Sequence, residues 1–199
     1  MAQKKKLQVV LAADGEVGRR CDTVLREMGI NPIQYYMWDR KAECDILLSV
    51  HWKEKFTQDV LDLCRIGAFN LHNSYLPWNK GANACTWAII DQTPHGATFH
   101  WMNKDIDKGD IFLQKQIIIT PNDTTDSLYQ RTVECEVAVF KAAMGLLLGG
   151  ARTRIRQRAK GTCHSKDDFN RLLRAMTTDK TIATDVDTFG AGFTVRFST

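Results

Sequence analysis

The stretch LQVVLAADGEVGRRCDTVLREMG, residues 7–29, indicates the fold class. Residues 7–13 form a short apolar run that is typical of a buried strand. From Val17 to Met28 the apolar side chains recur at helical spacing, and Gly29 then ends the pattern. A strand followed at once by a helix is the repeating unit of an α/β sheet, so we expect this alternation to continue along the chain.

The alternation continues through the first two thirds of the chain. Further strands are predicted at residues 32–38, 45–50, 68–72, 97–102 and 110–119. Further helices are predicted at residues 57–66, where Gly67 would end the helix, and at residues 82–91. This order implies parallel strands joined by crossover helices, and the later strands predict a sheet that becomes mixed, with helices on both faces.

A long amphipathic helix is predicted over residues 125–148, with Thr125 as its N-cap. Its buried stripe would contain Leu128, Cys135, Val139 and Met144. We predict one catalytic domain over residues 1–150, followed by a short C-terminal extension over residues 151–199 that packs on it or lies at a dimer interface.

The extension differs in character from the rest of the chain. Arginines at every second position from Arg152 to Arg158 predict a charged edge strand. A short helix is predicted at residues 167–176, and a hairpin or partner-contacting strand at residues 187–199.

Composition is that of an ordinary soluble globular protein. The 199 residues carry a net charge of only +4, and 44% of them are hydrophobic. The sequence contains no apolar run of about 18 residues, the length that a membrane-spanning helix needs. The six cysteines are scattered and include no C-x-x-C pair, so we expect reduced thiols, no metal site and a cytoplasmic location.

Polar side chains of catalytic type gather in residues 69–112. Asn70 and His72 are two apart on one predicted strand, so they share a face at its carboxyl end and together can hold an oxyanion. Asp107 precedes the turn at Gly109, and a carboxylate beside a histidine is an acid–base pair. Each feature alone is common in structural roles. His95 and His100 belong to no motif, and we interpret them as structural or surface residues.

In combination these residues resemble the folate-dependent formyltransferase family. The family signature is Asn-x-His, then S-x-L-P, then an Asp in a D-x-G turn; here Asn70, His72, Ser74–Pro77 and Asp107 stand in that order. The resemblance implies a Rossmann-like formyltransferase fold and transfer of a formyl group from N10-formyltetrahydrofolate to a primary amine, without a metal. It also implies that Asn70 and His72 hold the oxyanion and that Asp107 orients and charges His72 and helps to remove the amine proton.

The resemblance also implies where the folate lies. Its pterin would occupy a slot between the loop after the strand at 45–50 and the loop before Asp107, where backbone groups can bind the pterin edge. The cofactor-binding residues implied are Trp52, Lys53, Lys55, Phe56, Asn103, Asp105 and Ile106.

The acceptor amine is inferred from subfamily differences. Methionyl-tRNA formyltransferases and formyltetrahydrofolate hydrolases carry a further domain, for which 199 residues leave no room, so we expect neither. Glycinamide ribonucleotide formyltransferases bind phosphate with a G-x-G-S-N loop. Here residues 14–18 read Asp-Gly-Glu-Val-Gly, and their two carboxylates would repel a phosphate.

Residues 72–89 are more similar to the sugar N-formyltransferases, which act on nucleotide-linked amino sugars for surface polysaccharides. The substrate-binding residues predicted on this basis are Tyr75, Trp78, Asn79 and Lys80. We expect a small-molecule substrate, no nucleic acid and no membrane partner, with a homodimer left open. The alternatives are a glycinamide ribonucleotide or other small-amine formyltransferase and, in another class, a non-catalytic nucleic-acid-binding or interaction protein on the same fold.

Overall fold

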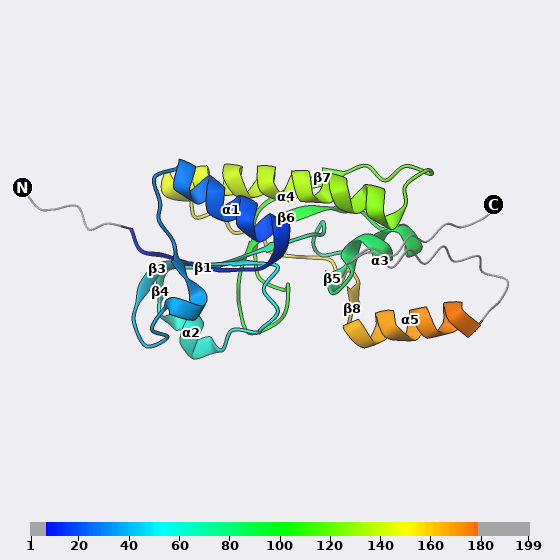
Figure 1. Cartoon of the computed structure of the whole chain (residues 1–199), viewed down its shortest axis with the longest axis horizontal. Coiled ribbons are helices and arrows are strands. Elements are labelled where there is room, and N and C mark those ends of the chain that lie inside the picture. Colours follow the sequence, from blue (N-terminus) through cyan, green and yellow to red (C-terminus); the bar gives the residue numbers. More distant parts are fainter. Residues whose placement is uncertain (1–6, 179–199) are drawn as a thin grey trace, which may run out of the picture.

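A six-stranded mixed sheet forms the centre of the molecule in a computed structural model that describes residues 7–178 (Figure 1). The strand order is β2-β1-β3-β4-β6-β7; the pairs up to β4 are parallel and the last two pairs are antiparallel. The mostly parallel, then mixed sheet is therefore confirmed.

The elements have the following bounds. The strands are β1 (Val9–Ala13), β2 (Ile33–Gln34), β3 (Cys44–Val50), β4 (Cys64–His72), β5 (Lys80–Gly81), β6 (His95–Trp101), β7 (Ile111–Ile117) and β8 (Cys163–His164). The helices are α1 (Gly15–Glu27), the 3-10 turn η1 (Tyr35–Met37), α2 (Gln58–Asp62), α3 (Ala84–Ile90), α4 (Thr125–Leu148) and α5 (Lys166–Thr178).

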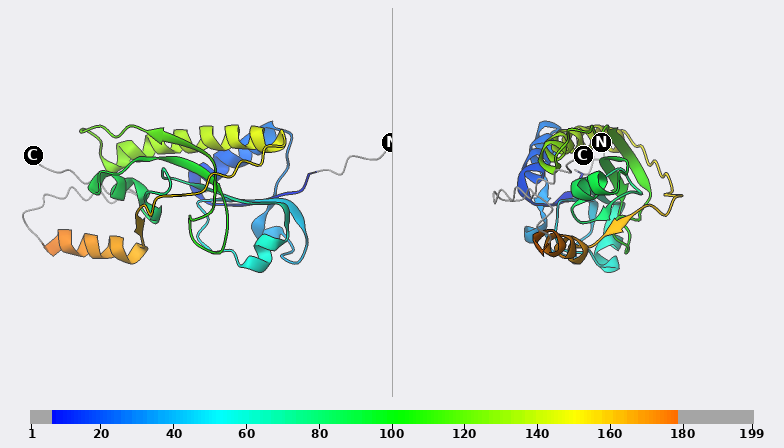
Figure 2. Two further views of the ribbon diagram at one scale, coloured as in Figure 1. Left: turned by 180° about the vertical axis from the view of Figure 1, so that it is seen from behind. Right: turned by 90° about the vertical axis from the view of Figure 1, so that its right-hand side faces the viewer.

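Helices cover both faces of the sheet. Figures 1 and 2 show α1 and α4 together on one face, with α2 on the other. Alternate residues of β1 serve the two faces: Val9 and Leu11 belong to the core under α1 and α4, whereas Val10 and Ala12 pack toward α2 and η1. All four residues of the predicted stripe of α4 are buried, and Cys135, Val139 and Met144 belong to the first of these cores.

Side-chain caps set the beginnings of the two main helices. Asp14 accepts a hydrogen bond from the Gly15 N–H at 2.8 Å, so α1 begins two residues before the predicted start. The N-cap of α4 is Thr124, not the predicted Thr125, because Thr124 and Ser127 exchange hydrogen bonds in a capping box.

The helix predicted at residues 57–66 is wrong in its second half. α2 ends at Asp62, and β4 begins at Cys64, four residues earlier than predicted. Gly67 is not a helix stop: it lies inside β4 with φ at +153°, and a Cβ there would collide with the ring of Trp101. The glycine is needed because the indole of the neighbouring strand β6 occupies that space.

The strand predicted at residues 32–38 is also shorter than expected. Only Ile33–Gln34 pair with β1, and the chain then turns into η1. The turn buries Tyr35, whose ring lies 5.6 Å from Trp52 and 5.2 Å from Phe56 between centroids. Tertiary packing of this aromatic cluster therefore overrides the local strand pattern.

The segment after α4 corrects a third prediction. Residues 151–160 form no strand; Ile155 alone makes a bridge, to Ile111 of β7. Arg154 lies over the Trp101 ring, with its Cζ 3.6 Å from the centroid. β8 then pairs with β5, and α5 confirms the helix predicted at 167–176. The hairpin predicted at 187–199 lies outside the described residues. Between residues 7 and 178 no helix is long and apolar enough to cross a membrane.

The space at Gly67 gives a test of the packing between β4 and β6. Gly67→Ala should lower the free energy of unfolding by about 3 kcal/mol, because the new methyl group meets the Trp101 ring and the backbone is strained. Gly145→Ala is the matched control: it lies in α4 with no atom within 4 Å of the added Cβ, and it should raise stability by about 0.5–1 kcal/mol. Urea denaturation of both variants measures the difference, and equal stability would contradict this account of β4.

Candidate active site

Two polar side chains leave β4 on the face away from α1 and α4. Phe69 and Leu71 belong to the core under α4, so Asn70 and His72 point to the opposite side of the sheet. In the antiparallel pairing with β6, Asn70 stands opposite His100 and His72 opposite Thr98. The change from parallel to antiparallel pairing at β4 thus puts a histidine of β6 beside the predicted amide.

Asp107 is held in a tight turn between β6 and β7. Its φ is +54°, an uncommon value for a residue other than glycine. The next residue but one, Gly109, has no room for a Cβ because the Trp101 carbonyl oxygen is in contact. Gln157, from the segment after α4, donates hydrogen bonds of 2.8 Å to the carbonyl oxygens of Asp107 and Gly109. The extension therefore helps to fix the turn that carries the carboxylate.

The structure brings the three predicted catalytic residues together. Asp107 Oδ1 lies 3.4 Å from Asn70 Nδ2, and Asp107 Oδ2 lies 3.6 Å from His72 Nε2. The Gly81 N–H donates to the same Oδ2 at 2.9 Å. Asp107 is 8% exposed, so its negative charge is stabilised by these partners and not by water.

His100 is a site residue that sequence reasoning missed. It is buried, and its Nε2 lies 3.1 Å from Asn70 Nδ2 and 3.5 Å from Asp107 Oδ1. Its Nδ1 donates to the Trp101 carbonyl oxygen at 2.8 Å, which fixes the ring and turns Nε2 toward the site. Of the two interpretations, structural or surface residue, burial excludes the second. The signal lay in the strand register, which places His100 opposite Asn70 and which the local sequence does not reveal.

Two opposing effects act on the Asp107 carboxyl. Burial raises its pKa, but His72, the hydrogen bond to His100 and the Gly81 N–H outweigh burial and leave the pKa well below its ordinary value. The group is therefore a carboxylate at neutral pH. Such a buried anion can orient imidazole rings and accept a proton from a reacting group.

The loop predicted to bind a cofactor uses most of its side chains for anchoring. Trp52 and Phe56 pack edge-on against Tyr35, and Lys53 pairs with Asp14 at 3.0 Å. Lys55 is exposed. In the second loop, the Asp105 N–H donates to Asn103 Oδ1 at 2.9 Å, and Ile106 is about half exposed. A role of these seven residues in cofactor binding stays a prediction.

The four predicted substrate residues divide into two pairs. Tyr75 and Trp78 are partly exposed in the turn after β4. Asn79 and Lys80 are buried, and their contacts are within the protein. Lys80 Nζ donates to two backbone carbonyl oxygens, those of Pro77 and Lys160, at 2.9 and 2.8 Å. Burial also lowers the pKa of Lys80.

Asn79 holds the His72 ring in place. Its carbonyl oxygen accepts a 3.0 Å hydrogen bond from His72 Nε2, which therefore carries a hydrogen. Its side chain binds Thr93 and Thr162, at 2.8 and 3.0 Å. Through these bonds Asn79 links His72 to the start of β6 and to the segment after α4. Direct contact of Asn79 and Lys80 with a substrate stays a prediction.

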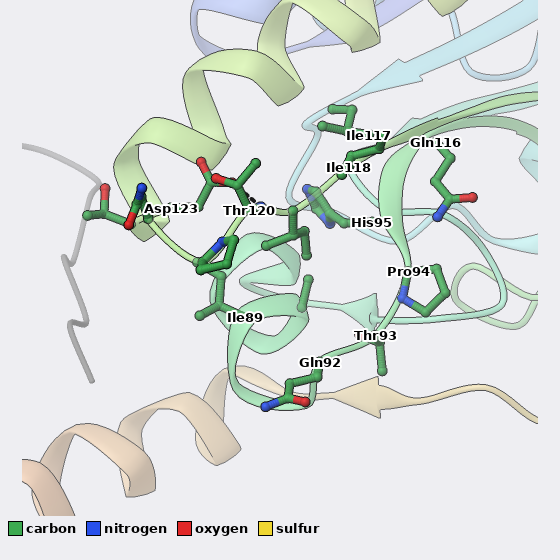
Figure 3. Close-up of a pocket in the computed structure, with 15 residues that line it drawn as sticks. Ile89, Gln92, Thr93, Pro94, His95, Gln116, Ile117, Ile118, Thr120 and Asp123 are labelled. Carbon is green, nitrogen blue, oxygen red and sulfur yellow. Dashed lines mark hydrogen bonds between the residues drawn. The ribbon is translucent and has the colours of Figure 1, made fainter. Parts of the chain in front are cut away.

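A separate cavity of about 960 Å³ lies near the start of β6 (Figure 3). It lies between the end of α3, the start of β6 and the loop from β7 to α4, and Ile89, Ile117 and Ile118 form part of its wall. His95 lines it, and burial lowers the pKa of this histidine to about 4. None of the residues that surround the Asp107 carboxylate lines this cavity.

The low pKa of Asp107 gives a pH-dependent stability. In the folded state its pKa is below the unfolded value of about 3.9, so the carboxylate stabilises the fold above that pH and loses this contribution as pH falls. The stability difference between the wild type and Asp107→Asn should therefore shrink as pH falls from 6 toward 3, measured by urea denaturation. Asp59→Asn is the matched control, because it removes the same charge from an exposed position in the first turn of α2. A constant difference for Asp107→Asn would contradict the assignment.

Comparison with known proteins relates this chain to a protein family. A family model described as formyl transferase matches residues 37–144. The chain is 29% identical to GDP-perosamine N-formyltransferase of Brucella melitensis over 136 residues, which are 63% of this chain and 52% of the relative. It is 31% identical to the bifunctional polymyxin resistance protein ArnA of Wigglesworthia glossinidia brevipalpis over 120 residues, 60% of this chain and 18% of the relative. The chain thus spans about half or less of these curated relatives.

A solved structure agrees with the family model. The formyltransferase PseJ from Anoxybacillus kamchatkensis superposes with a TM-score of 0.75 at 26% identity, covering 87% of this chain and 93% of that chain. The family model covers more than half of the residues and includes Asn70, His72, His100 and Asp107. The chain therefore belongs to the formyl transferase family, whose enzymes are folate-dependent.

Proposed function

We propose that this protein transfers a formyl group from N10-formyltetrahydrofolate to the primary amine of a nucleotide-linked amino sugar. The observation that carries the proposal is the convergence of Asn70 and His72 on the buried carboxylate of Asp107. The relatives support the substrate class: one is named a GDP-perosamine N-formyltransferase, and PseJ was solved with UDP-4,6-dideoxy-4-formamido-L-AltNAc and tetrahydrofolate.

The proposed chemistry needs three tasks from the protein. As the amine nitrogen bonds to the formyl carbon, the oxygen becomes an oxyanion, which Asn70 and His72 stabilise by donating hydrogen bonds. The amine must lose a proton, which Asp107 accepts directly or through water. The bond from the formyl carbon to N10 then breaks, and that proton is returned to the leaving nitrogen. No covalent enzyme intermediate is required.

The loop at residues 51–56 suits a pterin through its backbone. Its aromatic side chains Trp52 and Phe56 are packed on Tyr35, so they hold the loop and leave its N–H and C=O groups to bind the pterin edge. Such anchoring lowers the ordering cost of binding because the loop is already in place. Residues 103–106 form the other wall in this proposal.

The start of α1 disfavours glycinamide ribonucleotide as the acceptor. Asp14 already caps the helix, and Glu16 lies in its first turn, beside Arg20 at 3.7 Å. A phosphate at this helix N-terminus would meet two carboxylates, although helix N-termini generally attract anions. We therefore place the nucleotide of the acceptor near the partly exposed side chains of Tyr75 and Trp78, where an aromatic ring can stack on a base or sugar.

The arginines of the extension also disfavour the nucleic-acid-binding alternative. Arg154 stacks on Trp101 and lies 3.5 Å from Asp110, while Arg152 donates to the carbonyl oxygens of Leu147 and Ala151. Two of the four arginines thus serve the protein's own structure. They are not arranged as a free row of cations for a phosphate backbone.

A formylation assay tests the proposal. The protein is mixed with N10-formyltetrahydrofolate and a panel of UDP-, GDP- and dTDP-linked amino sugars beside glycinamide ribonucleotide, and the release of tetrahydrofolate is followed. We expect turnover with a nucleotide-linked amino sugar and none with the ribonucleotide. His72→Ala and Asp107→Ala should each lower kcat by about 100-fold or more, because each removes a group that acts on the reacting atoms.

His164→Gln serves as the matched control. His164 also pairs with an aspartate, Asp91, at 2.9 Å, but in the contact between β8 and the end of α3. The kcat of the His164→Gln variant should stay within about twofold of the wild-type value. Full activity of His72→Ala, or an equal loss in all three variants, would remove the catalytic assignment. Turnover of glycinamide ribonucleotide alone would leave the chemistry and overturn the substrate class.

A further inference from the structure

A carboxyl group is buried in the middle of α4, apart from the Asp107 cluster. The Glu136 side chain is 0% exposed, among residues of the core under α1 and α4. Its Oε1 lies 2.8 Å from His51 Nε2, and its Oε2 has no hydrogen-bond partner among the described residues. Burying a carboxylate costs several kcal/mol unless a partner compensates, so the contact with His51 decides whether Glu136 is tolerated.

His51 is the first residue after β3. It starts the loop of residues 51–56, and its φ of +53° turns the chain sharply away from the strand direction. A histidine seldom adopts this conformation without support from its surroundings. The hydrogen bond to Glu136 supplies that support, because it ties the turn to the longest helix of the fold.

The ties that hold this loop differ in strength. Lys53 pairs with Asp14, but their side chains are 77% and 49% exposed, and an exposed ion pair contributes little. Trp52 and Phe56 are held by ring packing on Tyr35, which fixes where their side chains lie more than it fixes the orientation of the loop backbone. The contact between His51 and Glu136 is directional and its carboxylate is fully buried, so we expect it to constrain the orientation of the loop's first residue more than the other ties do.

We propose that Glu136 is a positioning residue that acts through His51 to hold residues 51–56 in the conformation that receives the folate. This inference rests on the proposed function, because it takes the loop to be one wall of the pterin slot. Glu136 touches no reacting atom in this account. Its effect is on the binding of the formyl donor and not on the chemical step.

The charges around His51 predict how the contact between His51 and Glu136 changes with pH. Glu136 faces the ring from α4, Asp14 from the turn before α1, and Lys53 belongs to the same loop. Burial lowers the pKa of His51, but Glu136 and Asp14 outweigh burial and raise it above its ordinary value. The ion pair is therefore complete below the ordinary histidine pKa and is lost as pH rises through the raised value.

Two measurements on the full chain test the inference. Hydrogen exchange should show that Glu136→Gln speeds amide exchange in residues 51–56 by about tenfold, since a charge-assisted hydrogen bond becomes a neutral one. Exchange in β6 should be unchanged. In turnover assays the same variant should raise KM for N10-formyltetrahydrofolate by about tenfold, with kcat and KM for the amine within about twofold. Raising the pH of the wild type should lower the protection of the loop amides relative to their intrinsic exchange rate at each pH, and it should have no such effect on Glu136→Gln.

Glu134→Gln is the matched control. It lies two residues earlier on α4, where its carboxylate is exposed and paired with Arg20, and it should leave both loop exchange and KM unchanged. Adding Glu136→Gln to His51→Ala should have no further effect if the two residues act as one unit. Glu136→Asn is a second variant with a shorter side chain, and it should show the same faster loop exchange and higher KM for the folate as Glu136→Gln.

The outcomes separate this inference from the proposed function. If the wild type transfers formyl groups but Glu136→Gln leaves loop exchange and the folate KM unchanged, the positioning role is wrong and the function stands. A loss of kcat with unchanged KM would also overturn it. If the wild type neither binds tetrahydrofolate in calorimetry nor transfers a formyl group, the proposed function fails, and the folate role of Glu136 fails with it.

Discussion

The buried carboxylate of Asp107 is the constraint on which the rest of the site depends. An anion shielded from water must be compensated from within the protein, and here the compensation comes from separate parts of the chain. Asn70 and His72 come from β4, His100 from β6 and the Gly81 N–H from β5. Because one charge attracts all of these groups, they share one point at the edge of the sheet.

The sheet topology supplies the geometry that this charge requires. β4 runs parallel to β3 on one side and antiparallel to β6 on the other, so its carboxyl end lies at the change of direction. The loop from β6 to β7 can therefore fold back beside β4 and carry Asp107 to the strand ends. The segment after α4 locks that loop through Gln157, which makes the C-terminal extension a structural part of the site.

Two buried acids serve this half of the molecule in different ways. Asp107 lies among polar donors, and its reduced pKa keeps it ionised. Glu136 lies in an apolar core with His51 as its hydrogen-bond partner, on the face of α4 that contacts the sheet. In the proposed enzyme the first acts on the reacting groups and the second on the loop that receives the donor. Similarity to formyl transferases fits this division, because positioning and electrostatics perform most of an acyl transfer.

The sequence by itself determined those features that depend on local periodicity. These features follow from the periods of 3.6 residues in a helix and two residues in a strand, which do not depend on what packs against the element. They are the strand and helix at residues 7–29, the buried stripe of α4 and the common face of Asn70 and His72. The motif order from Asn70 to Asp107 was sufficient to indicate the family.

Only the tertiary structure decided the features that depend on residues distant in the chain. Gly67 looks like a helix stop until the Trp101 ring occupies its side-chain space, and the strand at Tyr35 ends where an aromatic cluster draws the ring inward. His100 joins the site through strand register, and the backbone of Asn79 orients His72 through a turn. These outcomes were hidden because packing and pairing energies between distant segments exceed the local preferences that a sequence pattern records.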